Sequence, residues 1–427
     1  MRGAAAGGVV ERNRLWRRLC DAVAASPDPL PTPVVVVDLD AFDANAADLA
    51  RRVTEANGAN GTAAGPEGKR PIRVASKSLR VPDLISRALA TPGFAGVLAY
   101  TLAEALWLVD HDVSDDVVVA YPSVDRGALA RLAASPAALA AVTVMVDCPE
   151  QLALLPQPTV GSRLRVAIDV DAGLRIAGAH LGPKRSPLHT AEAIGELAGL
   201  ILARPELALV GVMTYEGQVA GLADDVPGQR GRSAVVRRVK GLSVRQLGPR
   251  RAEIAAELDR LLAQAGEPPL EFFNAGGSGS LETSSADPVV TEVTAGSGLL
   301  VPSLFDHYRS FAPRPAAYFG LPVTRRPGPG MVTVHGGGLV ASGPAGSDRL
   351  PTPWAPAGLA LLPMEGAGEV QTPLVGEAAD RLSVGDLVWF RHAKSGEPFE
   401  HTPTAWLVRG EALVGSATTY RGHGLAF

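Results

Sequence analysis

Residues 72–77 of the chain read Ile-Arg-Val-Ala-Ser-Lys, a short apolar run that ends in a lysine. Such a run is typical of a buried β-strand, and Lys77 would then project from the carboxyl end of that strand. Burial beside apolar residues lowers the pKa of a lysine and favours the neutral amine, which can attack an aldehyde. A solvated lysine at the end of a strand is the alternative interpretation.

Runs of the same kind recur on both sides of this segment. The expected strands are 34–39, 72–77, 96–100, 116–121, 142–147, 164–170, 208–215, 271–275 and 290–295. The expected helices are 41–56, 82–91, 101–110, 124–134, 188–203 and 247–266. Near-continuous apolar strands separated by amphipathic helices predict an α/β fold with a parallel (β/α)8 barrel. The nine candidate strands exceed by one the eight that such a barrel needs.

The composition and the periodicity of the sequence change near residue 315. Helical periodicity ends there, and glycine, proline and short strand-like runs dominate the rest of the chain. This change predicts a C-terminal antiparallel β domain over 315–427, a barrel over 27–314 and a helical extension over 1–26. The Gly- and Arg-rich segment 216–246 is expected to form an exposed loop or a lid.

The bulk composition argues against several classes of protein. The 427 residues are 46% hydrophobic and 20% charged, with a net charge of −4 and no dense basic run, so nucleic-acid binding is not expected. A membrane span is not expected either, because the sequence lacks an uninterrupted apolar stretch of about 18 residues. The two cysteines, Cys20 and Cys148, form no metal-spaced pair. A reduced, cytoplasmic protein is the simpler interpretation, and a disulfide is the alternative.

A second chemical feature is the run Gly276-Gly277-Ser278-Gly279, which follows the expected strand 271–275. Glycine lets a backbone approach an anion closely, and successive N–H groups with a serine hydroxyl can bind a phosphate. Alone, the run is equally typical of a flexible turn. Together with Lys77 it predicts a site for pyridoxal 5′-phosphate (PLP), because that cofactor requires an imine lysine and a phosphate-binding loop.

Further residues extend this pattern over nearly the whole chain. They are Thr32-Pro33, Asp38-Leu39-Asp40, Asn45, Ser76-Lys77, Thr101-x-x-Glu104-Ala105, Tyr215-Glu216-Gly217, Gly276-Gly277-Ser278-Gly279, Gly385-Asp386 and Arg391-His392-Ala393-Lys394. In order and spacing they resemble the alanine racemase-like superfamily of fold type III PLP enzymes, particularly its D-serine dehydratase and D-threonine aldolase branch and the subgroup called amino-acid deaminase/aldolase. In that family the strand before the lysine strand belongs with the β domain. The resemblance therefore places 34–39 there and leaves eight barrel strands.

The resemblance also implies cofactor contacts. Tyr215 corresponds to the tyrosine of a Tyr-x-Gly-His signature in the cofactor pocket, with Gln218 in place of the histidine; a packed strand-end tyrosine is the alternative. The family often has an arginine near the PLP phenolic oxygen, in the pattern Asp-x-Gly-x-x-Arg-x-Gly. Arg175 comes one position early in the matching stretch that begins at Asp171, and a structural salt bridge is the alternative for it.

The clearest departure from the family lies in the expected β domain. Relatives carry His-x-Cys or His-x-Asp there, a pair that binds a divalent metal beside the substrate hydroxyl, whereas this chain has His392 and Lys394. A protonated lysine cannot ligate a dication and repels it, so a divalent metal is doubtful. We hypothesise that Lys394 supplies the positive charge instead and that His392 donates or accepts a proton, with His401 as a spare candidate. Surface pairing of Lys394 with Glu397 or Glu400 is the alternative.

These assignments imply a PLP-dependent lyase on D-configured β-hydroxy amino acids, working through a Lys77 internal aldimine. The amine freed by substrate can act as a base, so that loss of the α-proton leads to dehydration and deamination, and deprotonation of the β-hydroxyl leads to retro-aldol cleavage. One alternative is an amino-acid racemase with Tyr308 or Tyr318 as second base. Another is a non-catalytic PLP-binding protein, against which the β domain argues. By family analogy the enzyme is a homodimer with a small-molecule amino-acid substrate.

Overall fold

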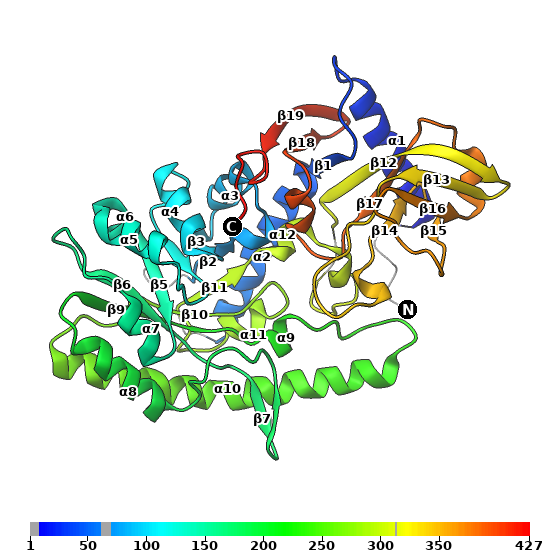
Figure 1. Ribbon diagram of the computed structural model, residues 1–427. Helices are drawn as coiled ribbons and strands as arrows, with labels where there is room; N and C mark the ends of the chain where they lie inside the picture. The colour runs from blue at the N-terminus through cyan, green and yellow to red at the C-terminus, as the bar shows by residue number, and fades with distance from the viewer. Residues whose placement is uncertain (1–7, 61–69, 312–313) are drawn as a thin grey trace.

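The computed structural model describes residues 8–60, 70–311 and 314–427. The larger part of the molecule is a closed barrel of parallel strands in the order β10-β11-β2-β3-β4-β5-β6-β9 (Figure 1). These strands are β2 (Ile72–Ala75), β3 (Phe94–Ala99), β4 (Val117–Val119), β5 (Val142–Val146), β6 (Leu164–Asp169), β9 (Leu207–Thr214), β10 (Phe272–Ala275) and β11 (Glu292–Ala295). The predicted α/β class with a parallel eight-stranded barrel is confirmed.

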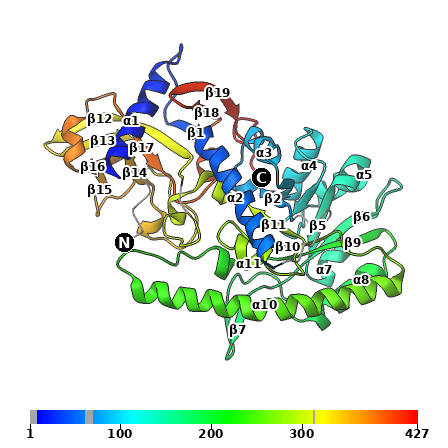
Figure 2. The same ribbon diagram turned by 180° about the vertical axis from the view of Figure 1, so that it is seen from behind.

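Helices cover the outside of the barrel, as Figures 1 and 2 show. They are α2 (Leu39–Asn60), α3 (Pro82–Leu89), α4 (Leu102–Asp110), α5 (Arg126–Ala134), α6 (Pro136–Ala141), α7 (Pro149–Leu154), α8 (Ala191–Leu202), α9 (Gly217–Ala220), α10 (Arg230–Ala265), α11 (Leu281–Ser285) and α12 (Ser297–Leu300). Val117 and Val119 of β4 join the core shared with these helices, whereas Val118 packs inside the barrel with Met145 and Phe272. Since successive strand side chains point to opposite faces, both faces of β4 are apolar, whereas β2 and β11 bury the ion pair Arg73–Glu292.

The second part of the molecule is a mainly antiparallel sheet. Its strands are β1 (Val34–Asp38), β12 (Ala317–Gly328), β13 (Met331–His335), β14 (Thr352–Ala355), β15 (Ala360–Leu361), β16 (Gln371–Val375), β17 (Leu387–Arg391), β18 (Thr404–Arg409) and β19 (Ala412–Thr418). Although β1 precedes the barrel in sequence, it pairs with β12 and β18 of this sheet. Helix α1 (Val9–Ala24) buries Leu19 against the same sheet beside Trp389. The domain limits 1–26, 27–314 and 315–427 stay predictions.

Two further strands, β7 (Leu174–Ile176) and β8 (Ala179–Leu181), form a separate antiparallel hairpin after β6. This hairpin leaves the barrel at the carboxyl end of β6, between β6 and α8 in the chain (Figure 1). In a parallel barrel the functional side chains gather at that end of the strands. The hairpin therefore shapes one side of the barrel mouth.

The prediction of a loop over 216–246 was wrong for its second half, because α10 begins at Arg230 and runs for 36 residues. Figures 1 and 2 show α10 passing along the barrel and extending beyond it. The helix contains Pro249 and continues through it. The helix continues because apolar side chains on both sides of the proline are buried, among them Leu247 and Ile254. Within the described residues, no helix has the length and hydropathy needed to cross a membrane.

Candidate active site

Lys77 lies at the mouth of the barrel, two residues after the end of strand β2 rather than at its last position. Strand β2 ends at Ala75, and the lysine sits in a turn of 3-10 helix over Ser76–Ser78. Its Nζ donates a hydrogen bond of 2.9 Å to the hydroxyl of Tyr121, which follows β4. The Lys77 side chain is exposed. The side chain of Lys77 is therefore not buried as the sequence predicted. Its hydrogen-bond partner is the hydroxyl of Tyr121.

Two tyrosines and an arginine form the wall next to Lys77. The guanidinium carbon of Arg185 lies 5.2 Å from the ring centroid of Tyr121 and 5.7 Å from that of Tyr215. Burial opposes ionisation of Tyr121, but the charges of Lys77 and Arg185 outweigh it and lower the pKa of the phenol. Burial raises the pKa of Tyr215 to about 12. Tyr121 is therefore the phenol suited to proton transfer, whereas Tyr215 stays protonated and only lines the site.

A buried carboxyl group, Asp169, ends strand β6 at the same mouth. Burial and, after it, the negative charge of Asp147 raise the pKa of Asp169 to about 7, although the charge of Arg185 partly opposes both effects. A carboxyl with a pKa near neutrality can exchange a proton at working pH. Asp169 is therefore a further candidate for acid–base chemistry or for contact with a basic ring nitrogen.

The glycine run lies across the mouth and is fixed from behind by Glu216. The buried carboxylate of Glu216 accepts hydrogen bonds from the backbone N–H of Gly276 (3.2 Å) and from the hydroxyl of Ser280 (3.0 Å). It also accepts a short hydrogen bond from Ser284, and it forms an ion pair of 3.0 Å with Arg251. Glu216 therefore positions the loop that follows β10.

The conformation of this loop requires glycine at several positions. Gly276 has a φ of +86°, in the left-handed region. A Cβ atom added at Gly279 would lie 2.3 Å from the carbonyl oxygen of Ala220, and one added at Gly277 would lie 3.3 Å from Cε2 of Tyr215. The loop backbone thus lies directly against the tyrosine wall. Backbone that close, free of side chains, fits a phosphate-bearing cofactor held between Lys77 and the loop.

Ser278, also predicted to bind the cofactor, is buried and engaged within the protein. Its hydroxyl accepts hydrogen bonds from the backbone N–H groups of Gly298 (2.9 Å) and Gly296 (3.4 Å). Its carbonyl oxygen accepts from Arg52, which is paired with Glu282. These bonds tie the glycine loop to the segment after β11, so the phosphate contact predicted for Ser278 stays a prediction.

The structure places Arg175 on the β7–β8 hairpin rather than beside Tyr121. Its guanidinium lies 3.0 Å from the carboxylate of Asp171, which also contacts His180 Nε2 at 3.0 Å. This is the structural salt bridge that was the alternative interpretation. Arg175 and Arg185 line one open cavity of about 560 Å3, but the contacts with Tyr121 belong to Arg185. The cofactor contact predicted for Arg175 stays a prediction.

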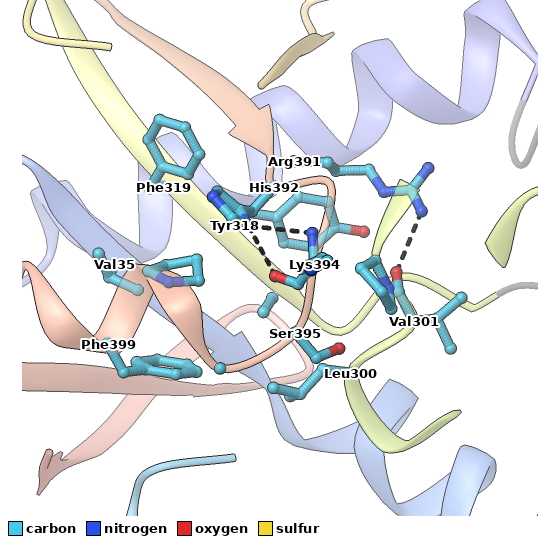
Figure 3. A pocket seen from close by; sticks show the side chains of 14 residues that line it. Val35, Leu300, Val301, Tyr318, Phe319, Arg391, His392, Lys394, Ser395 and Phe399 are labelled. Atoms are coloured by element: carbon cyan, nitrogen blue, oxygen red, sulfur yellow. Dashed lines mark hydrogen bonds between the residues drawn. The ribbon is translucent and has the colours of Figure 1, made fainter. Parts of the chain in front are cut away.

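His392 and Lys394 follow β17 and lie together (Figure 3). The Nδ1 atom of His392 is 3.0 Å from the backbone nitrogen and 2.6 Å from the carbonyl oxygen of Lys394. Burial lowers the pKa of His392, which favours the neutral imidazole. Lys394 Nζ donates to Ser342 Oγ (2.7 Å) and lies 3.8 Å from Glu397 Oε1, so the contact with Glu397 predicted as an alternative is present. Glu400 pairs with Arg80 instead.

A close contact brings this loop of the second sheet to the catalytic lysine candidate. Gly396 has a φ of +83°, and a Cβ atom added to it would lie 2.2 Å from the carbonyl oxygen of Lys77. The charge of Lys77 also lowers the pKa of Lys394, after the larger effect of burial. Lys77, His392 and Lys394 therefore share one region. The cavity in Figure 3, lined by His392 and Lys394, measures about 20 Å3, enough for a single water molecule.

Neither tyrosine suggested for a racemase presents a free hydroxyl to Lys77. Tyr308 donates to the carbonyl oxygen of Ala220 (3.2 Å), and Tyr318 donates to that of Pro315 (2.9 Å). Within the described part of the chain, no group of three or more His, Cys, Asp and Glu side chains is arranged to hold a metal ion.

A model of the alanine racemase N-terminal domain matches residues 80–300, just over half of the chain. The chain belongs to this family. Among curated proteins, 3-hydroxy-D-aspartate aldolase of Paracoccus denitrificans (strain Pd 1222) is 27% identical over 270 residues. That match covers 63% of this chain and 60% of the relative, less than two thirds of the relative's length.

Two solved structures share the fold of this alanine racemase-type chain. D-threonine aldolase from Filomicrobium marinum is 21% identical, with a TM-score of 0.72 over 93% of this chain and 97% of that one. D-threo-3-hydroxyaspartate dehydratase from Delftia sp. HT23 is 18% identical, with a TM-score of 0.64 over 91% of this chain and 97% of that one. The predicted relation to alanine racemase-like fold type III PLP enzymes is confirmed.

Proposed function

We propose that this chain is a PLP-dependent lyase that acts on D-configured β-hydroxy amino acids, by dehydration and deamination or by retro-aldol cleavage. Three kinds of support converge. The family is one of PLP enzymes, and the named relatives include aldolases and a dehydratase of D-β-hydroxy amino acids. The geometry at Lys77 and at the glycine loop fits the cofactor. The loop after β17 brings a cation and an imidazole to the same region.

Lys77 would hold the cofactor, and the loop around Gly276 and Gly279 would receive its phosphate. Arg185, Tyr121 and Tyr215 would form the remaining wall. PLP supplies an electron sink that acidifies the bonds at the substrate α-carbon. Its fit here rests on a loop that carries no side chain at its glycines and on an amine that contacts no carboxylate within hydrogen-bonding distance in the described structure.

Different residues of the chain would carry out the separate proton transfers. In dehydration the amine of Lys77 would take the α-proton, and the hydroxyl of Tyr121, 2.9 Å away, would exchange a proton with that amine. Lys394 places a positive charge at the substrate β-hydroxyl, where it stabilises negative charge on the oxygen. His392, favoured as the neutral imidazole, accepts the hydroxyl proton in retro-aldol cleavage or delivers one to departing water in dehydration.

One observation carries this proposal above the others. The loop of the second sheet that bears His392 and Lys394 packs directly on the carbonyl of Lys77, through the close approach of Gly396. The amine that would act at the α-carbon and the groups that would act at the β-oxygen are thereby held in one site by backbone contact. A non-catalytic PLP carrier has no use for such an arrangement.

The test is a substrate panel assayed for separate products. Purified protein loaded with PLP is incubated with D-threonine, D-serine and D-3-hydroxyaspartate, and with their L-enantiomers. Aldehyde, keto acid and ammonia are measured independently. We expect one of the D-substrates to yield aldehyde with glycine, or keto acid with ammonia, and Lys394→Met to lower kcat more than it raises KM. Racemised amino acid without either product set would overturn the lyase proposal.

Metal independence is part of the same proposal. Because Lys394 stands at the position where relatives are expected to have a ligand, dialysis against a chelator should leave turnover unchanged. Activity lost on chelation and restored by a divalent ion would refute that assignment for Lys394. We also propose a cytoplasmic homodimer, supported by the composition and by analogy with the family; light scattering at working concentration tests the dimer.

A further inference from the structure

Glu104 is a buried carboxyl that the proposed chemistry does not use. It lies in the first turn of α4, with a fully buried side chain. Its Oε2 accepts the backbone N–H of Tyr100 (2.7 Å), and its Oε1 accepts the hydroxyl of Tyr420 (2.7 Å). The hydroxyl of Ser76, the residue before Lys77, donates to the carbonyl oxygen of Leu98 (3.2 Å) and lies close enough to the same carboxyl to lower the pKa of Glu104. One carboxyl group thus joins α4, the lysine turn and the segment after β19.

Tyr420 belongs to residues 419–427, which follow β19 and return to the barrel beside α3 (Figures 1 and 2). Its side chain is 1% exposed, and its backbone N–H donates to the carbonyl oxygen of Arg80 (2.9 Å). Its ring makes edge contacts with Trp107 of α4 and with Phe427, at centroid distances of 5.9 and 5.1 Å. Apolar packing and hydrogen bonds therefore both hold residues 419–427 against the barrel.

The lysine turn is held on its other side as well. Arg80 has a φ of +53°, and its Nε donates to the carbonyl oxygen of Lys77 (3.2 Å). Its guanidinium is paired with Glu400 at 2.7 Å. The backbone N–H groups of Leu79 and Arg80 both donate to the carbonyl oxygen of Ser76. Contacts from the second sheet therefore reach both ends of the short turn that carries Lys77.

We propose that Tyr420 and Glu104 are positioning residues for Lys77, acting through Ser76 and Arg80. The inference rests on the proposed function, since it assigns to residues 419–427 the task of fixing the amine opposite Tyr121. Loss of the Tyr420 hydroxyl leaves a buried carboxyl oxygen short of a donor, and such a group must find another partner. The Ser76 hydroxyl beside that carboxyl would turn to it from the carbonyl of Leu98, so the turn would shift and the Lys77–Tyr121 hydrogen bond would weaken.

The primary test uses Tyr420→Phe in the cofactor-free protein. Amide hydrogen exchange is followed at Leu79 and Arg80, whose N–H groups close the lysine turn. We expect their exchange to accelerate about tenfold, because an unpaired buried acceptor costs roughly the free energy of a tenfold change. The control is Thr372→Val, which removes a buried hydroxyl bonded to the carbonyl of Gly336 in the second sheet. It should leave those two amides unchanged.

The second variant, Ser76→Ala, guards against a folding defect in Tyr420→Phe. Its matched control is Ser285→Ala, since the buried Ser285 hydroxyl has no hydrogen-bond partner in the described structure. In the PLP-loaded protein, Ser76→Ala should shift the pH midpoint of the visible absorbance by about half a unit, and Ser285→Ala should not. Wild-type exchange in Tyr420→Phe together with an unshifted midpoint in Ser76→Ala would overturn the inference. Because exchange is read without cofactor, failure of PLP to bind would count against the proposed function alone.

Discussion

Replacing Gly279 by alanine tests whether the glycine loop binds PLP. The added Cβ would lie 2.3 Å from the carbonyl oxygen of Ala220 and 2.7 Å from Cε1 of Tyr308, about 1 Å inside normal contact. Overpacking of this kind costs about 1–3 kcal/mol. If the loop moves to relieve the strain, the same free energy appears as lost cofactor affinity, equivalent to an increase of about 5- to 150-fold in the Kd for PLP.

The assay pairs an equilibrium titration with PLP and a thermal melt of the cofactor-free protein. The matched control is Gly199→Ala on α8, where nothing lies within 4 Å of the added Cβ. That variant should bind PLP normally and melt at the wild-type temperature or slightly above, because alanine favours the helix. If Gly279→Ala both binds PLP and melts like the control, the glycine loop neither resists a side chain nor contributes to cofactor binding, and the assignment fails.

Two other outcomes follow from buried carboxyl groups. The pKa of Asp169 is about 7 in the folded protein, above its ordinary value, so the folded state retains a proton that the unfolded state loses and stability falls as pH rises from about 4 to 7. Asp169→Asn should remove that fall, raising the melting temperature more at pH 8 than at pH 4; equal shifts would contradict the assignment. Glu216→Ala removes one of the two carboxylates paired with Arg251 and the acceptor of the Gly276 N–H and the Ser280 hydroxyl, and it should cost about 3–5 kcal/mol. Glu55→Ala, at an exposed pair, should leave melting unchanged; equal melting of the two variants would contradict the role given to Glu216.

The barrel was predictable because its strands are short runs made mostly of apolar residues, and such runs stand out in a sequence. Lys77 was found because it follows one of them. Tyr121 ends the expected strand 116–121 in the same way, so the sequence carries the same signal for it. Strand β1 carries an equally apolar run, Val34–Asp38, and pairs in the other sheet. Pattern alone does not distinguish the two environments, since both bury the strand completely.

Arg185 could not be predicted in this way. It comes from an exposed loop between β8 and α8, and its contact with Tyr121 depends on the course of the β7–β8 hairpin. Arg175 lies near the position of the arginine in the family pattern, yet its neighbour Asp171 offers a nearer partner within four residues. Local ion pairing therefore determined where Arg175 points. The approach of Gly396 to Lys77 joins positions far apart in sequence, which no local pattern encodes.

The central claim is that Lys77 is the residue that bonds to PLP, and borohydride reduction followed by peptide mapping tests it most directly. The chain has five lysines, so the site of attachment can be assigned uniquely. We predict that the peptide containing Lys77 carries the reduced cofactor and that Lys77→Ala protein carries none. Attachment at another lysine, or an unlabelled protein that still absorbs as a PLP complex, would contradict the account.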